Sequence, residues 1–244
     1  MRIGIIGSNG RMGEALKFAI AEAAHGYAGG VDADDGTDAL TALAESADIL
    51  IDFSAPQALE ANLNAAVAAG TSIVIGTTGL EERHHWLVDN ASESIAVLQT
   101  GNTSLGVTML AHLVHEAASR LGEDWDIEIA EMHHRHKVDA PSGTALLLGE
   151  AAAAGRGADL TEVSDRGRDG ITSARKQGDI GFVSLRGGSV AGEHQVFFAT
   201  EHERIELNHR AEKRALFARG AMRAAEWLMG KQAGRYSMPD VLGL

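Results

Sequence analysis

The first hundred residues repeat one pattern, in which a short apolar run is followed by a stretch with hydrophobic residues at helical spacing. The apolar runs cover residues 2–7, the segment that ends at Asp32, 47–53, 72–76 and 95–99. Alternating strands and helices with short links favour a parallel sheet, because parallel strands need crossover connections. We therefore predict an α/β fold that begins with a Rossmann-type parallel-sheet domain covered by helices on both faces.

The pattern changes after residue 104. A long helix is expected, then a strand over 126–132 and a Gly-, Arg- and Asp-rich loop over 155–178. The apolar residues of the helix are Val107, Leu110, Leu113, Val114, Ala117 and Leu121. Three strands without intervening helices follow, over 180–186, 195–200 and 204–209, which is typical of an antiparallel or mixed sheet. An amphipathic helix over about 211–230 can pack on either domain. A smaller α+β domain is expected here.

Charge and hydrophobicity exclude several classes of partner. The formal net charge is −13, which argues against a nucleic-acid or anionic-membrane surface. No apolar run approaches the roughly 20 residues that span a bilayer, and Met1 leads directly into a strand without a secretory segment. There is no cysteine, which leaves the redox compartment undetermined. We expect a cytoplasmic protein in which any anion site needs a local basic cluster.

The turn after the first strand is a candidate phosphate-binding site. It reads Gly7, Ser8, Asn9, Gly10, Arg11, Met12 and Gly13. Small residues let the backbone approach a pyrophosphate, and the following helix offers free N–H groups. The G-x-x-G-x-x-G spacing alone also fits a purely structural turn.

Asp32 strengthens the prediction of a dinucleotide site. It ends the second strand about 20 residues further on, where a carboxylate accepts hydrogen bonds from a ribose diol. Ala33, Asp34 and Asp35 provide no arginine for a 2′-phosphate, so NADH is expected to be preferred over NADPH, although Arg11 could assist a phosphate.

Two further turns are predicted to lie beside the cofactor. They contain Gly76, Thr77, Thr78 and Gly79 after the fourth strand, and Thr100, Gly101, Asn102, Thr103 and Ser104 after the fifth. Ligands of open α/β sheets bind beyond the carboxyl ends of the strands, where both turns fall. Ordinary turn chemistry explains each segment equally well when it is taken alone.

The strongest chemical signal is a basic cluster in this acidic chain, made of His133, His134, Arg135, His136 and Lys137. Neighbouring cations lower histidine pKa values, which suits proton transfer near neutral pH. A solvated loop is one alternative. A metal site is another, but Arg and Lys repel a divalent cation and no carboxylate completes a ligand pattern, so no metal is expected.

The segment after the basic cluster is a candidate anion cradle. Pro141, Ser142, Gly143 and Thr144 open an Ala- and Leu-rich helix, whose first N–H groups and hydroxyls can bind a carboxylate. An anion held there would lie beside the His and Lys side chains.

Nearly end to end, the chain resembles the dihydrodipicolinate reductase family of the bacterial diaminopimelate and lysine pathway. The resemblance rests on segments 7–13, 52–54, 76–79, 133–144, 192–194 and 240–242, of which 133–144 is close to diagnostic. It implies reduction of 4-hydroxy-tetrahydrodipicolinate to tetrahydrodipicolinate by NADH or NADPH. It also implies a dinucleotide-binding domain over 1–104, a substrate-binding and tetramerisation domain over 105–209, a return of residues 210–244 to the first domain, and a homotetramer.

The resemblance also assigns roles to residues. His133 is then the catalytic proton donor or acceptor and Lys137 the proton donor, while His134, Ser142, Gly143 and Thr144 hold a small dicarboxylate substrate. The cofactor positions are Gly7, Ser8, Asn9, Gly10, Arg11, Met12, Asp32, Gly76, Thr77, Thr78, Thr100, Gly101, Asn102 and Thr103.

Two residues depart from the family pattern. Thr103 stands where many relatives carry phenylalanine beside the nicotinamide, and Ala33 replaces an arginine that some relatives use for the NADPH phosphate. Two other functions remain open on the residues alone: a non-catalytic dinucleotide sensor, and a different amino-acid-pathway dehydrogenase. The sensor does not need His133 and Lys137 beside an anion cradle, and the dehydrogenase would oxidise an alcohol.

Overall fold

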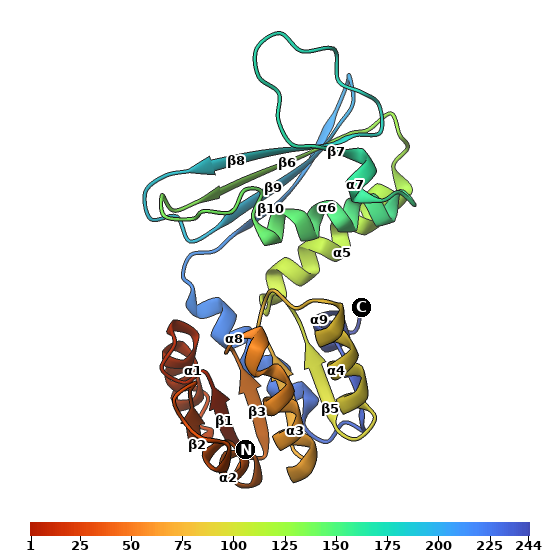
Figure 1. Cartoon of the computed structure of the whole chain (residues 1–244). Coiled ribbons are helices and arrows are strands. Elements are labelled where there is room, and N and C mark those ends of the chain that lie inside the picture. Colours follow the sequence, from red (N-terminus) through yellow and green to blue (C-terminus); the bar gives the residue numbers. More distant parts are fainter. The chain divides into compact units, whose positions relative to one another are not determined.

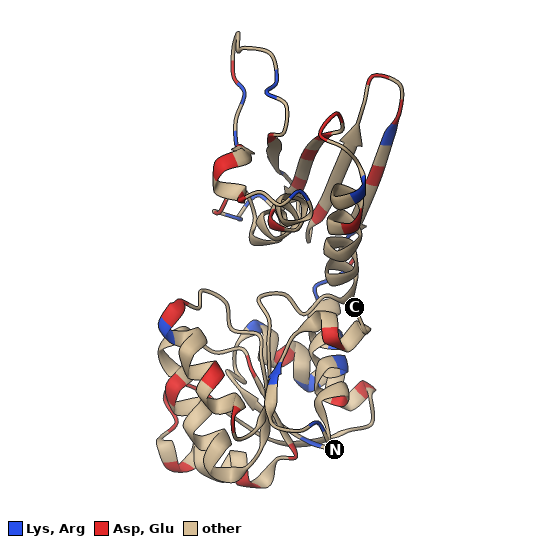
Figure 2. Ribbon diagram, turned by 90° about the vertical axis from the view of Figure 1, so that its right-hand side faces the viewer, with Lys and Arg blue, Asp and Glu red and all other residues tan.

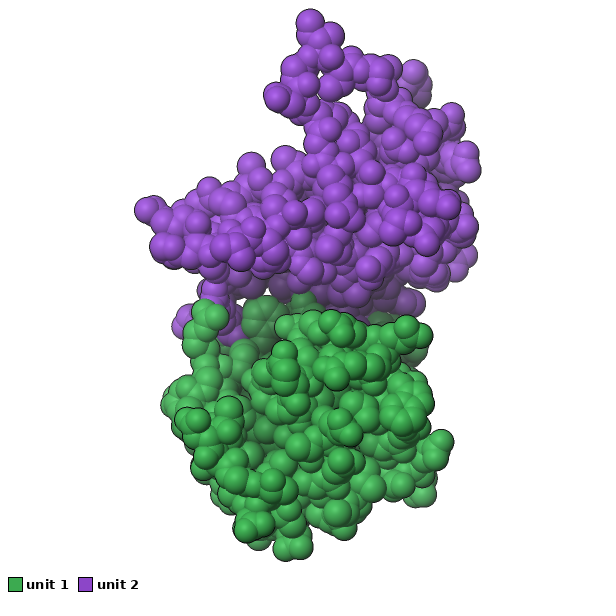
Figure 3. All heavy atoms as spheres, in the orientation of Figure 1, with its two compact units in different colours: residues 1–105, 215–244 green, residues 106–214 purple.

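The computed structural model describes all residues from 1 to 244, and the chain divides into two compact units. The first contains residues 1–105 and 215–244, and the second contains residues 106–214 (Figure 3). The first unit is thus built from both ends of the chain.

The first unit holds a six-stranded parallel sheet in the order β11-β5-β4-β3-β1-β2 (Figure 1). Its elements in chain order are β1 (Arg2–Ile6), α1 (Arg11–Glu22), β2 (Gly26–Val31), α2 (Thr37–Ser46), β3 (Ile49–Asp52), η1 (Pro56–Ala58), α3 (Leu59–Ala69), β4 (Ser72–Ile75), α4 (Glu82–Ser92), β5 (Ala96–Gln99), α8 (Ala215–Leu228), β11 (Gly234–Tyr236) and α9 (Met238–Leu242). The predicted α/β class and parallel sheet are confirmed.

Both faces of this sheet are buried. Ile3, Ile5 and Val74 pack on the side of α1, α8 and α9, whereas Leu50 and Ile73 belong to the cluster formed with α2, α3 and α4. Successive strand side chains point to opposite faces, which explains why these strands are almost continuously apolar.

The ends of α3 are set by a short 3-10 helix and by a glycine. Gly70 caps the helix in the left-handed conformation at φ 69°. Pro56 does not begin the α-helix. It begins the short 3-10 helix η1, and α3 starts at Leu59.

The sequence prediction missed β11 and α9. The strand is three residues long and pairs Gly234 with Ala96 and Tyr236 with Leu98. A strand of this length is too short to show the alternation of apolar and polar residues by which strands are recognised in a sequence. Helix α8, which was predicted, buries Ala221, Met222 and Leu228 in the first unit.

The second unit is a mixed five-stranded sheet in the order β10-β9-β6-β8-β7. Its elements are α5 (Leu105–Arg120), β6 (Asp126–His133), α6 (Gly143–Gly155), α7 (Leu160–Val163), β7 (Ser164–Asp165), β8 (Ile180–Arg186), β9 (Glu193–Ala199) and β10 (Arg204–Arg210). Strand β6 pairs with β8 in parallel and with β9 antiparallel. Residues of α5 and α6 form the core with the inner side chains Ile127, Ile129 and Phe198.

Two details of the second unit were not evident from the sequence. Leu113 of α5 is 44% exposed, and the buried positions are Val107, Thr108, Leu110, Val114 and Ala118. The segment 155–178 is only partly irregular, because α7 and β7 lie within it. Helical spacing alone could not decide which neighbouring position on the helix faces the sheet.

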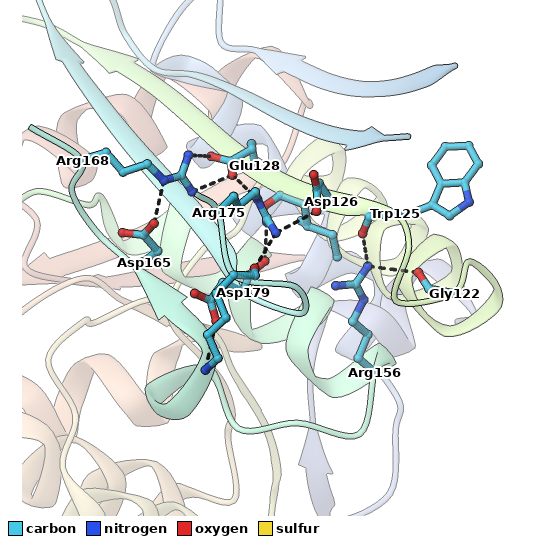
Figure 4. Close-up of polar contacts among 11 residues, drawn as sticks. Gly122, Trp125, Asp126, Glu128, Arg156, Asp165, Arg168, Arg175 and Asp179 are labelled. Carbon is cyan, nitrogen blue, oxygen red and sulfur yellow. Dashed lines mark hydrogen bonds and ion pairs between the residues drawn. The ribbon is translucent and has the colours of Figure 1, made fainter. Parts of the chain in front are cut away.

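The rest of that segment is tied to β6 by arginines (Figure 4). Arg175 donates to Asp126 and Glu128 at 2.8 and 2.9 Å and to the Ile127 carbonyl, and Arg168 donates to Glu128 at 2.8 Å. These contacts replace the regular backbone pairing that a Gly-rich loop lacks.

Acidic residues are distributed over the helices of the first unit (Figure 2). No helix is both long enough and apolar enough to cross a bilayer.

Candidate active site

The glycine-rich turn lies between β1 and α1, at the carboxyl edge of the parallel sheet. Gly7 has a φ of 83°, and a Cβ there would lie 2.7 Å from the Phe53 carbonyl oxygen. A Cβ at Gly13 would lie 2.3 Å from the Ser8 carbonyl oxygen. No side chain caps α1, whose N-cap is Gly10, so its first N–H groups are left for a ligand. These features fit a dinucleotide pyrophosphate.

Asp32 lies beside this turn, as the motif predicts. Its carboxylate accepts hydrogen bonds from Ser8 Oγ at 2.7 Å and from the Asn9 backbone N–H at 3.0 Å. Ala33 is exposed. The Asp32 carboxylate therefore lies at the end of β2, and the residue that follows it, Ala33, carries no guanidinium group.

A buried carboxylate that the sequence analysis did not select, Asp52, organises the next turns. It is fully buried and accepts hydrogen bonds from the Ser54 N–H at 2.8 Å, Asn62 Nδ2 at 3.0 Å and Thr77 Oγ1 at 3.2 Å. Burial raises the pKa of Asp52, and these donors act against that rise. Asp52 thus joins the turn after β3 to Thr77.

Gly76 is required beside the Phe53 ring, because a Cβ at this position would lie 2.3 Å from ring carbons. Thr78, two residues further on, is exposed. The turn 76–79 therefore has a fixed base and an accessible outer part.

The turn after β5 is stabilised by hydrogen bonds between its own residues. Thr100 Oγ1 donates to the Asn102 carbonyl at 2.8 Å, and Asn102 Oδ1 accepts from the Ser104 N–H at 2.9 Å. Thr103 is buried, and its hydroxyl donates to the Phe217 carbonyl of α8 at 2.8 Å. Gly101 is exposed.

In the second unit, His133 at the end of β6 belongs to a buried acid–base cluster. Its Nδ1 lies 2.5 Å from Glu131 Oε2, and Arg186 donates to both Glu131 oxygens at 2.8 Å. Burial raises the pKa of Glu131, but hydrogen bonds from Arg186, His133 and Ser184 outweigh it and hold that pKa below its usual range. An ionised carboxylate thus orients the His133 ring and leaves Nε2 as its other reactive atom.

His134 and Lys137 have separate partners. His134 Nε2 lies 2.6 Å from Arg214 NH2, and burial followed by the nearby Arg214 charge lowers the pKa of His134. Lys137 Nζ pairs with Asp139 Oδ1 at 2.8 Å. No group of three or more His, Asp or Glu side chains is arranged to hold a metal ion.

The predicted helix start is present as α6. Ser142 is its N-cap and is 1% exposed, and its Oγ accepts from the Ala145 N–H at 3.2 Å. The Ser142 N–H donates to Glu131 Oε1 at 3.2 Å, so the cap and the His133 cluster share one carboxylate. Gly143 is exposed and Thr144 is half-buried in the first turn.

Sequence reasoning did not select Glu131, Arg186, His194 or Arg214 as site residues. Glu131 and His194 face each other across β6 and β9, and Arg186 comes from β8. The sequence of β6 did offer one signal for Glu131. Buried and less buried positions alternate along this strand, and Glu131 and His133 occupy the buried face, which is otherwise apolar.

A parallel sheet with a glycine-rich turn, joined to a unit that carries a buried acid–base cluster, defines a dinucleotide-dependent oxidoreductase. The family model described as dihydrodipicolinate reductase, N-terminus, matches residues 1–103, and that described as dihydrodipicolinate reductase, C-terminus, matches residues 106–242. The chain belongs to the dihydrodipicolinate reductase family.

Individual relatives agree. The chain is 55% identical to the 4-hydroxy-tetrahydrodipicolinate reductase of Zymomonas mobilis subsp. mobilis, over 100% of this chain and 98% of that protein. It is 61% identical to the reductase of the same name from Parvibaculum lavamentivorans, over 85% of this chain and 76% of that protein. The dipicolinate-bound dihydrodipicolinate reductase from Paenisporosarcina sp. TG-14 shares the fold with a TM-score of 0.74 at 20% identity, over 97% of each chain. The prediction of an NAD(P)H-dependent reductase of the diaminopimelate pathway is confirmed.

Proposed function

We propose that His133 and Lys137 supply the proton chemistry when this reductase converts 4-hydroxy-tetrahydrodipicolinate to tetrahydrodipicolinate. The observation that carries the proposal is the buried contact of 2.5 Å between His133 Nδ1 and Glu131. A carboxylate on one ring nitrogen fixes the imidazole and favours proton exchange at the other. His133 Nε2 is therefore the atom that gives or takes the proton.

The reaction needs a proton because it adds a hydride and eliminates water from the ring. The reduced nicotinamide supplies the hydride when it is bound. Charge that develops on the conjugated ring must be quenched, and the hydroxyl must leave as water. Lys137 suits this acid role, since its ammonium is held by Asp139 at 2.8 Å and its side chain is 22% exposed.

The dicarboxylate is bound by the start of α6 and by His134. Gly143 and Thr144 form the first turn of a helix whose N-terminal N–H groups attract anions. Ser142 adds a hydroxyl, and Arg214 places a permanent positive charge beside His134. Two carboxylates need this concentration of donors in a chain of net charge −13.

The cofactor is held by the first unit, with the 7–12 turn at the pyrophosphate and Asp32 at the ribose diol. The turns 76–78 and 100–103 lie at the same edge of the sheet, at the ends of β4 and β5. The Asp32 carboxylate and the acidic residues that follow Ala33 disfavour a 2′-phosphate, so NADH is preferred.

The active form is a cytoplasmic homotetramer assembled through the second unit. Helices α5 and α6 cover one face of its sheet, whereas Val183 and Leu185 on the other face are 53% and 51% exposed. Exposed apolar strand residues of this kind suit burial against the same sheet of other copies.

The test follows nicotinamide absorbance with substrate generated from pyruvate and aspartate semialdehyde. His133→Ala and Lys137→Ala should each lower kcat by about a hundredfold or more, the range of general acid–base catalysis, with NADH affinity unchanged. The wild-type kcat/KM should be higher with NADH than with NADPH. Full activity in either variant would contradict the proton assignment.

A further inference from the structure

His194 is a buried histidine that the proposed mechanism does not use. It lies on β9 between Glu131 of β6 and His209 of β10 and is 4% exposed. Its Nε2 lies 3.1 Å from Ser142 Oγ, and its Nδ1 is buried with no hydrogen-bond partner. Its ring stands edge-on to His133, with centroids 5.1 Å apart.

The surroundings of His194 keep it neutral. Burial, followed by the charge of His133, lowers its pKa to about 4, and His209 and Lys137 act in the same direction against Glu131. A neutral imidazole carries a single N–H. The hydrogen bond to Ser142 therefore has two possible directions.

In one direction, the Ser142 hydroxyl donates to Nε2, and the N–H at Nδ1 is a buried donor without an acceptor. In the other, Nε2–H donates to Ser142 Oγ, and Nδ1 carries only a lone pair. Each direction leaves one buried donor without an acceptor in the free protein, the Nδ1–H in the first and the Ser142 hydroxyl in the second. Only the Ser142 hydroxyl lies at the start of α6, where a bound carboxylate can accept from it, so binding of the substrate favours the second arrangement.

The second arrangement has a consequence for Ser142. Its Oγ already accepts from the Ala145 N–H at 3.2 Å, and a second bond from His194 fills both lone pairs. The hydroxyl proton must then point away from both donors. It is a free donor at the N-terminus of α6, where the anion cradle lies.

We propose that His194 is a positioning residue, which donates through Nε2 to Ser142 and so directs the Ser142 hydroxyl proton toward a carboxylate of the bound substrate. This inference rests on the proposed binding of the dicarboxylate at the start of α6. The bound carboxylate selects this arrangement, because it gives the Ser142 hydroxyl the acceptor that the free protein does not offer in this direction.

The test uses dipicolinate, the dicarboxylate bound in the Paenisporosarcina relative, as the probe. The amide of His194→Gln reaches about as far as Nε2, whereas the shorter amide of His194→Asn matches Nδ1. We expect Gln to keep the dipicolinate Kd within about threefold and Asn to weaken it about tenfold, as for the loss of one oriented hydrogen bond. The KM for the substrate should rise in parallel in the Asn variant, with a small change in kcat.

A double-mutant cycle separates positioning from simple folding damage. In a Ser142→Ala background, exchanging His194 for Asn should weaken dipicolinate binding no further, because the hydroxyl is already gone. Equal losses in both backgrounds would overturn the proposal, as would equal affinities of the Gln and Asn variants. NADH affinity and the thermal midpoint report whether each variant is folded.

Long-range proton–nitrogen NMR correlations of the histidine rings give a direct second measurement. The proposal expects the Nε2–H tautomer of His194 in the complex with dipicolinate, and an Nδ1–H tautomer in that complex would overturn it. Loss of the proton roles of His133 and Lys137 would leave these results unchanged, so the two proposals fail independently.

Discussion

Glu131 shows how much chemistry a single side chain can organise. Its two oxygens accept from Arg186, His133 and the Ser142 backbone, so one carboxylate joins β8, the end of β6 and the start of α6. It is 1% exposed, and only complete pairing makes such a buried charge tolerable. The residue is thus both a structural junction and the partner that orients His133, for which we propose a catalytic role.

Replacing Glu131 with Gln should change how stability depends on pH. The pKa of Glu131 is lower in the folded protein than the ordinary 4.5, so its contribution to stability is complete above that value. The contribution is lost as the pH falls through the folded pKa. We expect Glu131→Gln to cost about 3 kcal/mol at neutral pH and to flatten the acid limb of the stability profile.

Thermal or urea unfolding of both proteins from neutral pH down to about pH 3 measures this difference. Parallel acid limbs for the two proteins would show that Glu131 is not the titrating group. The kcat of the variant should also fall, since His133 loses its anionic partner.

At the scale of elements, the local patterns predicted most of the strands and most of the helices but missed the short strands β7 and β11. The cluster 133–137 and the helix start at Ser142 were visible because their residues are consecutive. Glu131 meets Arg186 and His194 only through the pairing of β6 with β8 and β9, and strand order is not encoded in any local window. The role of Asp52 was hidden for the same reason, because Thr77 reaches it from the turn after the neighbouring strand β4.

Helix α8 meets the turn after β5 at a glycine. A Cβ at Gly220 would lie 1.8 Å from the Thr103 carbonyl oxygen. Alanine normally stabilises the interior of a helix relative to glycine, but here it should cost about 3 kcal/mol or prevent folding of the first unit.

Gly26→Ala is the matched control for Gly220→Ala, because a Cβ there makes only ordinary contacts, the nearest at 3.4 Å to the Arg2 side chain. It should stay within about 0.5 kcal/mol of the wild type in urea unfolding. A Gly220→Ala protein as stable as this control would refute the close packing of α8.

The irregular segment 166–179 depends on Arg175 for its order. This side chain is 18% exposed and bonds to Asp126, Glu128 and three backbone carbonyls. Arg175→Ala should make the segment about tenfold more sensitive to limited proteolysis, because local opening becomes easier. Arg204→Ala, which removes an exposed pair with Glu206, should leave the cleavage rate unchanged.

At the scale of the whole molecule, the proposed tetramer makes the outer face of the second sheet an assembly surface. Val183→Glu combined with Leu185→Glu should place charges in that interface and lower the mass measured by light scattering. Phe18→Glu, on an exposed position of α1, is the control and should keep the wild-type mass. An unchanged mass in the double variant would argue against assembly through this face.

The division of the chain also bears on how it folds during synthesis. Residues 106–214 are continuous and can form their core as soon as they have left the ribosome, whereas the sheet of the first unit lacks β11 and the cover of α8 until residues 215–244 emerge. The segment translated first therefore completes its fold last. A chaperone that shields the nascent dinucleotide-binding half would have to remain in place until residues 215–244 have emerged.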